Sequence, residues 1–404
     1  IDTRFLLSSY VFIITLLCDA RKLSSSFSSP SYKTIRDTLI KHKNIDWICF
    51  DRMNNESEYG GIKLATGTKC KSVYHFDKAD RVLSIDSDFL NLDENPVYNT
   101  KKFSLKRKVR GVDYSKATMN RLYVVESNMS QTGAMADNRL RLKQSDIDSY
   151  VSELWDRFRT KKKAGKDWID KVYEDLFAHK GASVVKGGPR LSRESHAMIA
   201  LINKKLKNIG KTVQYIPLNV KGVNCCPSNT EHYDDLIKEV ESGDVDCLIF
   251  LDVNPAYTSN MLKFKKIPLK IHFGMYYDET AKLCDWHIPK AHYLESWGDC
   301  ESIDGTKSIV QPLISPLYPD SQSELDFLVM LSQSLLSDKT VLDADSGYNL
   351  IRDMYSQNWS KYLYEGKTRD GYPKSIYSDL NKGNGKNWKG QKDFSFNSSS
   401  RNEI

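Results

Sequence analysis

The sequence lacks the short cysteine spacings from which metal clusters are built. Its 404 residues include eight cysteines, at positions 18, 49, 70, 225, 226, 247, 284 and 300, with no C-x-x-C pair among them. Iron–sulfur clusters and structural zinc sites need thiolates that such spacings bring together. Cys49 and Cys247 lie inside apolar runs, where a thiol behaves as a small hydrophobic side chain. The cysteines therefore predict no cluster, no zinc site and no disulfide framework.

Several catalytic signatures are also absent. The chain has no G-x-G-x-x-G fingerprint, no P-loop and no G-x-S-x-G elbow, so neither a dinucleotide fold nor a triad hydrolase is indicated. Residues 184–198, VVKGGPRLSRESHAM, place glycines between an expected strand and an expected helix, where a βαβ unit can bind phosphate. Without the full fingerprint, we favour a tight turn with ordinary helix capping over a nucleotide cradle.

Composition and charge indicate a folded, mildly basic protein. Hydrophobic residues make up 40% and charged residues 27% of the chain, and the formal charge is +7. Lys and Arg gather in residues 101–110 and 157–166, without the interleaved aromatics of a nucleic-acid site. We expect solvated loops there rather than a nucleic-acid or lipid footprint, and no nucleic-acid partner. Residues 5–18, FLLSSYVFIITLLC, are short for a membrane helix, and we favour a buried strand of an N-terminally truncated chain over a targeting segment.

Helix and strand signals alternate along the chain. Apolar, β-rich runs end in polar residues at two series of positions, which are Asp86, Asp88, Glu126 and Asn128 in the first and Asp252 and Asn254 in the second. Strands that are buried on both faces predict parallel sheets, whose functional edge lies at the carboxyl ends of the strands. The expected fold class is therefore α/β, with two doubly wound, mostly parallel-sheet lobes.

Local signals place several helix ends. Ser29 is a candidate N-cap with Pro30 in the first turn, and Ser145 and Asp148 form a candidate capping box for a later helix. The expected buried face of the first of these helices carries Ile35, Leu39 and Ile40.

The chain divides into five segments on these signals. We expect an unassigned segment 1–21, a first α/β lobe 22–160, a second α/β lobe 161–340, a helical extension 341–365 and a disordered tail 366–404. The basic run that ends at Lys166 suggests the boundary between the lobes, and the tail is dominated by Gly, Asn, Lys and Ser.

Residues 284–299, CDWHIPKAHYLESWGD, gather residue types that bind metals or transfer protons. Cys284, His287, His292 and Glu295 are the candidate ligands, but the two histidines are five apart with a proline between them, so they cannot share one helical face. An acid–base pair of His292 with Glu295 or Asp299 is a second interpretation. We favour a third, in which this is a long loop whose acidic residues cap backbone donors and whose two tryptophans anchor it to the core.

Longer ordered motifs resemble one family. DWHIPKAHYLESWGD with DGTKSIVQPLISPLY (304–318) is similar to the molybdopterin oxidoreductase-like region of the iron–sulfur subunit of alternative complex III, a bacterial quinol-oxidising membrane complex. Stretches 73–90, 123–142, 196–215, 245–258 and 272–289 follow in matching order, so the resemblance covers roughly residues 22 to 360.

The resemblance implies a fold of the molybdopterin oxidoreductase type and a region that has lost its molybdenum cofactor. Iron–sulfur clusters would belong to a ferredoxin-like part farther downstream, which this sequence does not contain. The implied partners are a cytochrome c subunit and integral membrane subunits, with the chain peripheral on the periplasmic side of the inner membrane. We therefore expect a cofactor-free structural and assembly domain that is not catalytic alone, with no metal site of its own.

A second hypothesis is a fragment of an active molybdopterin (bis-guanine dinucleotide) oxidoreductase. In either case the resemblance implies a pterin groove, filled or vestigial, with these candidate lining residues: Asn254, His292, Glu295, Ser296, Trp297 and Asp299.

Overall fold

The computed structural model describes most of the chain between residues 29 and 367, together with one strand near the N-terminus. The described residues are 12–16, 29–40, 45–49, 55–109, 113, 115, 117–160, 167–218, 230–259, 262–302, 304–335 and 346–367. All but the first two residues of the predicted disordered tail, and most of the unassigned N-terminal segment, lie outside them. The chain forms two compact units, unit 1 from residues 1–53 and 224–372 and unit 2 from residues 54–223 and 373–404.

Unit 1 is built on a parallel sheet whose described strands run in the order β11-β10-β9-β1-β2. The order reverses between β9 and β1, which makes the sheet doubly wound and puts a topological switch point at their carboxyl ends. The apolar N-terminal run supplies β1, which pairs with β2 on one side and β9 on the other. The strand bounds are β1 Phe12–Leu16, β2 Ile45–Cys49, β9 Cys247–Leu251, β10 Leu269–Gly274 and β11 Trp286–Pro289.

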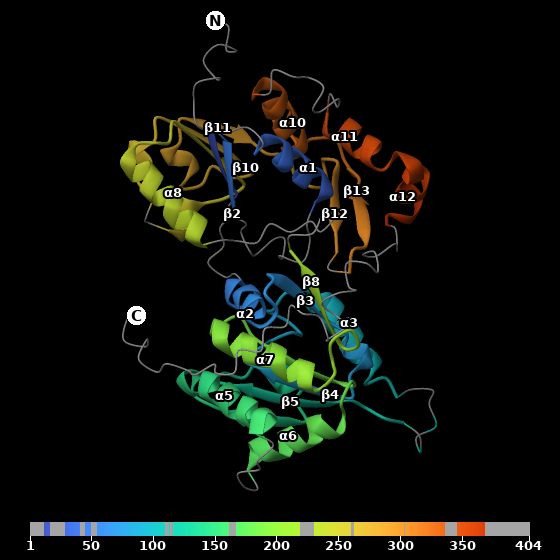
Figure 1. Cartoon of the computed structure of the whole chain (residues 1–404). Helices are drawn as coiled ribbons and strands as arrows, with labels where there is room; N and C mark the ends of the chain where they lie inside the picture. Colours follow the sequence, from blue (N-terminus) through green and yellow to red (C-terminus); the bar gives the residue numbers. More distant parts are fainter. Residues whose placement is uncertain are drawn as a thin grey trace, which may run out of the picture. The chain divides into compact units, whose positions relative to one another are not determined.

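Helices cover both faces of this sheet (Figure 1). Alternate residues of β9 enter different cores: Ile249 and Leu251 pack with α1 and α10, whereas Leu248 and Phe250 pack with α8. The helices and the antiparallel hairpin of unit 1 are α1 Pro30–Leu39, α8 Thr230–Ser242, α9 Pro255–Thr258, β12 Gly298–Glu301, β13 Lys307–Val310, α10 Glu324–Leu335, α11 Gly347–Met354 and α12 Trp359–Glu365, with short 3-10 turns η2 Phe264–Lys266, η3 Ala281–Leu283 and η4 Ser356–Asn358.

Unit 2 has a second parallel sheet, with its described strands in the order β6-β5-β4-β7, and a separate antiparallel pair of β3 and β8. Here the order reverses between β4 and β7. The strands are β3 Cys70–Tyr74, β4 Arg81–Ile85, β5 Arg121–Glu126, β6 Asn138–Arg141, β7 Ser183–Gly187 and β8 Val213–Pro217.

The sheet of unit 2 is also buried on both faces. Val82, Leu122 and Val184 enter one core, and their neighbours along the strands enter the other. The helices are α2 Glu56–Thr66, α3 Pro96–Leu105, α4 Gln131–Ala134, α5 Gln144–Thr160, α6 Trp168–Ala178 and α7 Arg193–Lys205, with the 3-10 turn η1 Phe76–Lys78. Two doubly wound α/β lobes are therefore present, as the sequence predicted.

The two units do not follow the expected lobe boundary at residues 160 and 161. That boundary falls inside unit 2, because β4 pairs with β7 across it. Unit 1 is discontinuous, because β1 and β2 join a sheet whose other strands come from beyond residue 246. The expected helical extension contains α11 and α12, whose Ile351 and Tyr362 belong to the core of unit 1.

Of the predicted helix ends, the first is confirmed and the second is wrong. Ser29 caps α1 by accepting a hydrogen bond from the backbone N–H of Tyr32, and Ile35 and Leu39 are buried, but Ile40 is exposed. The predicted capping box of Ser145 and Asp148 is wrong, because α5 begins at Gln144 and already includes both residues. No helix among the described residues is both long and apolar enough to cross a membrane.

Candidate functional site

An aspartate follows the central strand at the switch point of unit 1. Asp252 has a φ of +52°, and its carboxylate lies 2.9 Å from the Nζ of Lys290, which also contacts Glu324 at 2.6 Å. Burial opposes the charge on Lys290, but Glu324 and Asp252 outweigh it and raise the pKa of the ammonium. Asn254, two residues on, is bonded to Glu279 and Thr280 rather than held free for a ligand.

The switch point of unit 2 repeats this arrangement. Asp86 also has a φ of +52°, and its carboxylate pairs with the guanidinium of Arg190 and accepts a hydrogen bond from Gln144 at 3.0 Å. A Cβ on Gly188 would lie 1.7 Å from the carbonyl oxygen of Asp86, so only glycine allows the two strand exits to meet. At both switch points the basic side chain is thus neutralised by the chain's own carboxylate.

The helix that follows the glycine-rich turn of unit 2 also has its N-terminus occupied. Asp148 accepts hydrogen bonds from the backbone N–H of Ser192 at 3.1 Å and from the hydroxyl groups of Ser192 and Ser195 at 3.1 and 2.7 Å. A helix N-terminus is where a phosphate would bind, and here the Ser192 hydroxyl caps α7 and is itself held by a carboxylate of α5. The geometry agrees with the sequence interpretation of a capped turn.

The first part of the predicted loop contains a strand: residues 284 and 285 form a bend, and β11 follows at Trp286–Pro289. His287 lies directly opposite His272 on β10, with their Nδ1 atoms 2.9 Å apart. Trp286 is 64% exposed, so the prediction that both tryptophans anchor this stretch is wrong for this one. Burial raises the pKa of the Cys284 thiol to about 12. Among the described residues, no group of three or more His, Cys, Asp or Glu could hold a metal ion.

The segment from His292 to Ser296 is a compact turn. Glu295 accepts a hydrogen bond from the backbone N–H of His292 at 3.2 Å, and the Ser296 hydroxyl donates to the His292 carbonyl at 3.1 Å. The His292 ring accepts a hydrogen bond from the backbone N–H of Leu294 at 3.3 Å, and its centroid lies 4.2 Å from that of the tilted Tyr293 ring. Glu295 therefore meets the backbone of His292, and the imidazole is held within the turn.

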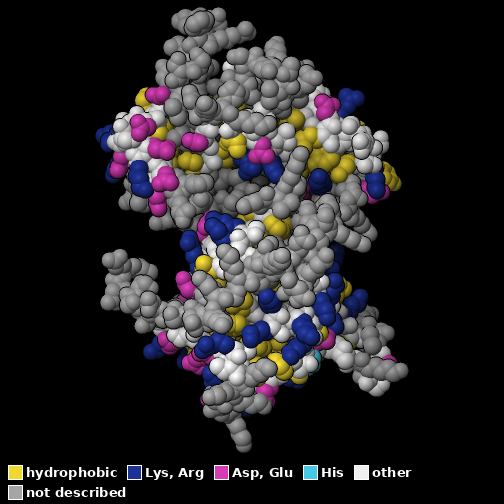
Figure 2. Space-filling model, in the orientation of Figure 1, with side chains coloured by type: hydrophobic (Ala, Val, Ile, Leu, Met, Phe, Trp, Pro, Cys, Tyr) yellow, Lys and Arg dark blue, Asp and Glu magenta, His cyan; other side chains and the backbone are white. Residues whose placement is uncertain are grey.

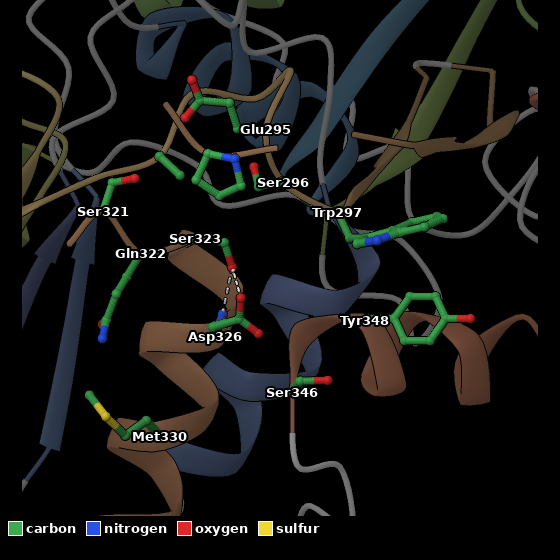
Figure 3. Close-up of a pocket in the computed structure, with 12 residues that line it drawn as sticks. Glu295, Ser296, Trp297, Ser321, Gln322, Ser323, Asp326, Met330, Ser346 and Tyr348 are labelled. Atoms are coloured by element: carbon green, nitrogen blue, oxygen red, sulfur yellow. Dashed lines mark hydrogen bonds between the residues drawn. The ribbon is translucent and has the colours of Figure 1, made fainter. Parts of the chain in front are cut away.

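Glu295, Ser296 and Trp297 do come together at a pocket of about 510 Å³ in unit 1 (Figure 3). Its remaining lining is drawn largely from α10, α11 and the segment before α10. Asp326 is fixed there by the Ser323 hydroxyl and by the backbone N–H of Gly347 at 2.7 Å. The lining residues are Ala291, Glu295, Ser296, Trp297, Pro316, Ser321, Gln322, Ser323, Asp326, Met330, Ser346 and Tyr348.

Charge and shape in this pocket favour neutral or cationic groups. Among the described residues that line the pocket, the charged ones are the two acids, Glu295 and Asp326. Trp297 stands 5.0 Å from Tyr348, measured between ring centroids, and forms one aromatic wall of the pocket. Sequence reasoning missed Tyr348 and Asp326, which carry no local signal and lie 29 residues or more downstream of Trp297.

Asp299 does not line the pocket with Glu295, Ser296 and Trp297 but lies in the core of unit 1. It is buried, and it accepts hydrogen bonds from the hydroxyls of Ser29, Ser31 and Tyr355 at 2.5, 2.6 and 2.9 Å. Burial raises the pKa of this carboxyl group, and those hydrogen bonds oppose the rise. Asp299 thus fastens β12 to the first turn of α1, whereas Asn254, His292 and Asp299 are absent from the pocket lining.

Comparisons with known proteins give a likeness of fold. No protein-family model and no curated protein sequence matches the chain. The solved structure of acetylene hydratase from Pelobacter acetylenicus matches with a TM-score of 0.64 and 13% identity, over 92% of this chain and 62% of that one. The formyltransferase/hydrolase complex from Methylorubrum extorquens, in complex with methylofuran, matches with a TM-score of 0.53 and 11% identity, over 83% and 94%.

These likenesses bear on the architecture alone. At such low identity they show the fold alone, an α/β architecture with parallel sheets, which is the fold class the sequence predicted. The chain spans 62% of the length of acetylene hydratase, so no activity follows from the match.

Proposed function

We propose that this chain is a cofactor-free structural and assembly domain of a membrane-associated, quinol-oxidising electron-transfer complex. Its partners would be a cytochrome c subunit and integral membrane subunits, and it would lie peripherally on the periplasmic side of the inner membrane. The ordered sequence resemblance supports the complex, and the fold supports an oxidoreductase-like origin.

One observation carries the cofactor-free part of the proposal: a basic side chain at each switch point, and the N-cap of α7, are already bonded to carboxylates of the chain. Arg190 is paired with Asp86, Lys290 is paired with Asp252, and Ser192, the N-cap of α7, is bonded to Asp148. A pterin guanine dinucleotide carries phosphates, which need such cations and helix ends. The residues present therefore do not fit this cofactor, and we assign no catalytic step to it.

The acidic pocket supports the same conclusion. A phosphate placed beside Glu295 or Asp326 would meet like charge, which costs free energy wherever water is partly excluded. The alternative, a fragment of an active molybdopterin oxidoreductase, would require Arg190 and Lys290 to exchange their internal partners for cofactor phosphates.

Substitutions in the turn at the pocket test the proposal. We expect His292→Gln or Glu295→Gln to lower the melting temperature or the yield of co-isolated cytochrome c, because both side chains hold the backbone of the turn. Quinol oxidation per assembled complex should stay unchanged. Asp320→Asn is the matched control, because Asp320 is an exposed carboxylate outside the pocket.

The outcome against the proposal is specific. It fails if either variant melts and assembles like the parent while the assembled complex loses quinol oxidation, since the turn would then take part in turnover.

A further inference from the structure

The mild net charge of the chain conceals a strong difference between its two units. Residues 54–223 of unit 2 contain 32 Lys and Arg against 20 Asp and Glu, a formal charge of +12. Unit 1 contains 21 Lys and Arg against 29 Asp and Glu, a formal charge of −8. In Figure 2, Lys and Arg are spread over the visible face of unit 2, whereas Asp and Glu gather over α8 of unit 1. A basic lobe of this kind implies an anionic partner.

Five exposed lysines of unit 2 stand at the ends of η1 and α7 and in the turns before β7 and β8, near the end of the sheet where β4 and β7 begin. We name this set, Lys78, Lys180, Lys205, Lys207 and Lys211, the lysine edge. Backbone hydrogen bonds join the three turns: Asp80 N–H to the Ala182 carbonyl at 2.7 Å, Gly181 N–H to the Leu206 carbonyl at 2.7 Å, and His75 N–H to the Thr212 carbonyl at 2.8 Å. The lysine edge therefore lies at the opposite end of the sheet from the switch point.

The carboxylates near this edge are already matched by other cations. Asp175 pairs with Arg81 at 2.7 Å and Arg121 at 3.0 Å, and Asp80 pairs with Lys106 at 2.7 Å. None of the lysine edge has a carboxylate within salt-bridge distance among the residues that the structure describes. Residues 195–223 contain no Asp or Glu at all, so the positive field there is not locally cancelled.

The backbone at Lys207 adds an independent observation. It has a φ of +56° just beyond the end of α7, a position that usually holds glycine or asparagine. Lysine costs more free energy than glycine in this backbone conformation, so the backbone geometry does not account for a charged side chain here.

We propose that the lysine edge docks on an anionic lipid surface. The charges come from separate segments of the chain and do not converge on one groove. They are lysine ammonium groups, which bind anions as point charges, whereas arginine binds a phosphate in a fixed bidentate geometry. Both features favour a surface of many anionic headgroups over a single bound phosphate. Phe177, 38% exposed at the end of α6, has the Nζ of Lys180 3.3 Å from its ring centroid and would enter the interface beside the lysine. This docking does not depend on the function proposed above.

Vesicle binding by the full chain tests the inference. The probe is phosphatidylcholine vesicles with and without phosphatidylglycerol, followed by sedimentation at increasing salt. We expect binding only with phosphatidylglycerol, weakening as salt rises. The variant Lys180→Gln, Lys205→Gln, Lys207→Asn and Lys211→Gln should bind several-hundred-fold more weakly, at about fivefold for each lysine lost.

A charge-matched control separates the lysine edge from net charge. Lys143, Lys263, Lys265 and Lys282 are exposed lysines elsewhere, and changing all four to Gln removes the same charge. The control should bind like the parent. If the fourfold variant fails to fold, Lys180→Gln and Lys211→Gln are measured singly, each with an expected loss of about fivefold.

Three results would overturn the inference. These are no binding to phosphatidylglycerol vesicles, equal losses in the variant and the control, and tighter binding of a short RNA duplex at the same salt. The last would assign the lysine edge to nucleic acid instead of lipid.

Discussion

The buried carboxylate of Asp299 gathers hydroxyl groups from three parts of unit 1. Removing it leaves Ser29, Ser31 and Tyr355 without their acceptor in a site that water does not reach freely. We expect Asp299→Ala to lower the free energy of unfolding by roughly 2–4 kcal/mol, because several hydrogen bonds to a charged group are lost together. Urea unfolding measures this, with Asp320→Ala as the exposed control. A loss below about 0.5 kcal/mol, the usual surface value, would contradict this role.

His196 makes the stability of unit 2 depend on pH. Burial lowers the pKa of its imidazole to about 4, from an unfolded value near 6.5. Below pH 6.5 the unfolded chain takes up a proton on His196 that the folded chain does not. The neutral, buried His196 therefore makes its full contribution to the free energy of unfolding above pH 6.5, and this contribution is lost as the pH falls toward 4. The shift corresponds to about 3 kcal/mol. His196→Gln should reduce the difference between the free energies of unfolding at pH 7 and at pH 4. If the free energy of unfolding changes with pH equally in parent and variant, this role of His196 is disproved.

At the scale of single elements, Asp148 connects α5 to the start of α7. Its carboxylate accepts hydrogen bonds from the backbone N–H and the hydroxyl of Ser192, the N-cap of α7, and from the hydroxyl of Ser195. We expect Asp148→Ala to cost about 1–3 kcal/mol, the usual cost of leaving such donors without their acceptor. Chemical denaturation measures the change. Glu153→Ala on the exposed side of α5 is the control and should have little effect. Equal effects from the two substitutions would show that the cap contributes nothing.

The helices and strands show which features local sequence patterns can predict. Ser29, Pro30 and the apolar spacing after them predicted α1 because these signals act within one or two turns of chain. The exits at Asp86 and Asp252 were predicted because a strand buried on both faces is a local pattern. Ser145 misled because it stands one residue inside α5, and the helix partner of Asp148 is about 44 residues away, beyond any local signal.

The candidate site was predicted in part for the same reason. Glu295, Ser296 and Trp297 are adjacent in sequence and reach one pocket, whereas Asp326 and Tyr348 arrive from helices that fold onto them. Asp299 points to the core because side chains alternate along β12, where Asp299 and Glu301 are on the buried face.

At the scale of the whole molecule, the division into units predicts how the chain can be cut. Both sheets and both cores of unit 2 come from residues 54–223. We therefore expect this fragment to fold alone, with one cooperative thermal transition and a near-ultraviolet circular dichroism signal from packed aromatic side chains. Deleting residues 1–53 should instead unfold unit 1, because it removes β1, β2 and α1 from that unit's sheet and core. A non-cooperative 54–223 fragment, or a deletion that leaves unit 1 intact, would contradict this division.

At both switch points a basic side chain is paired with a carboxylate of the chain, and we propose that these ion pairs close the switch points to a phosphate-bearing pterin. The most direct measurement is the molybdenum and tungsten content, together with released pterin, of the full chain purified from a host that makes the cofactor. The account predicts amounts far below one per chain for both metals and for pterin. Near-stoichiometric metal with pterin would contradict it and would favour the active oxidoreductase.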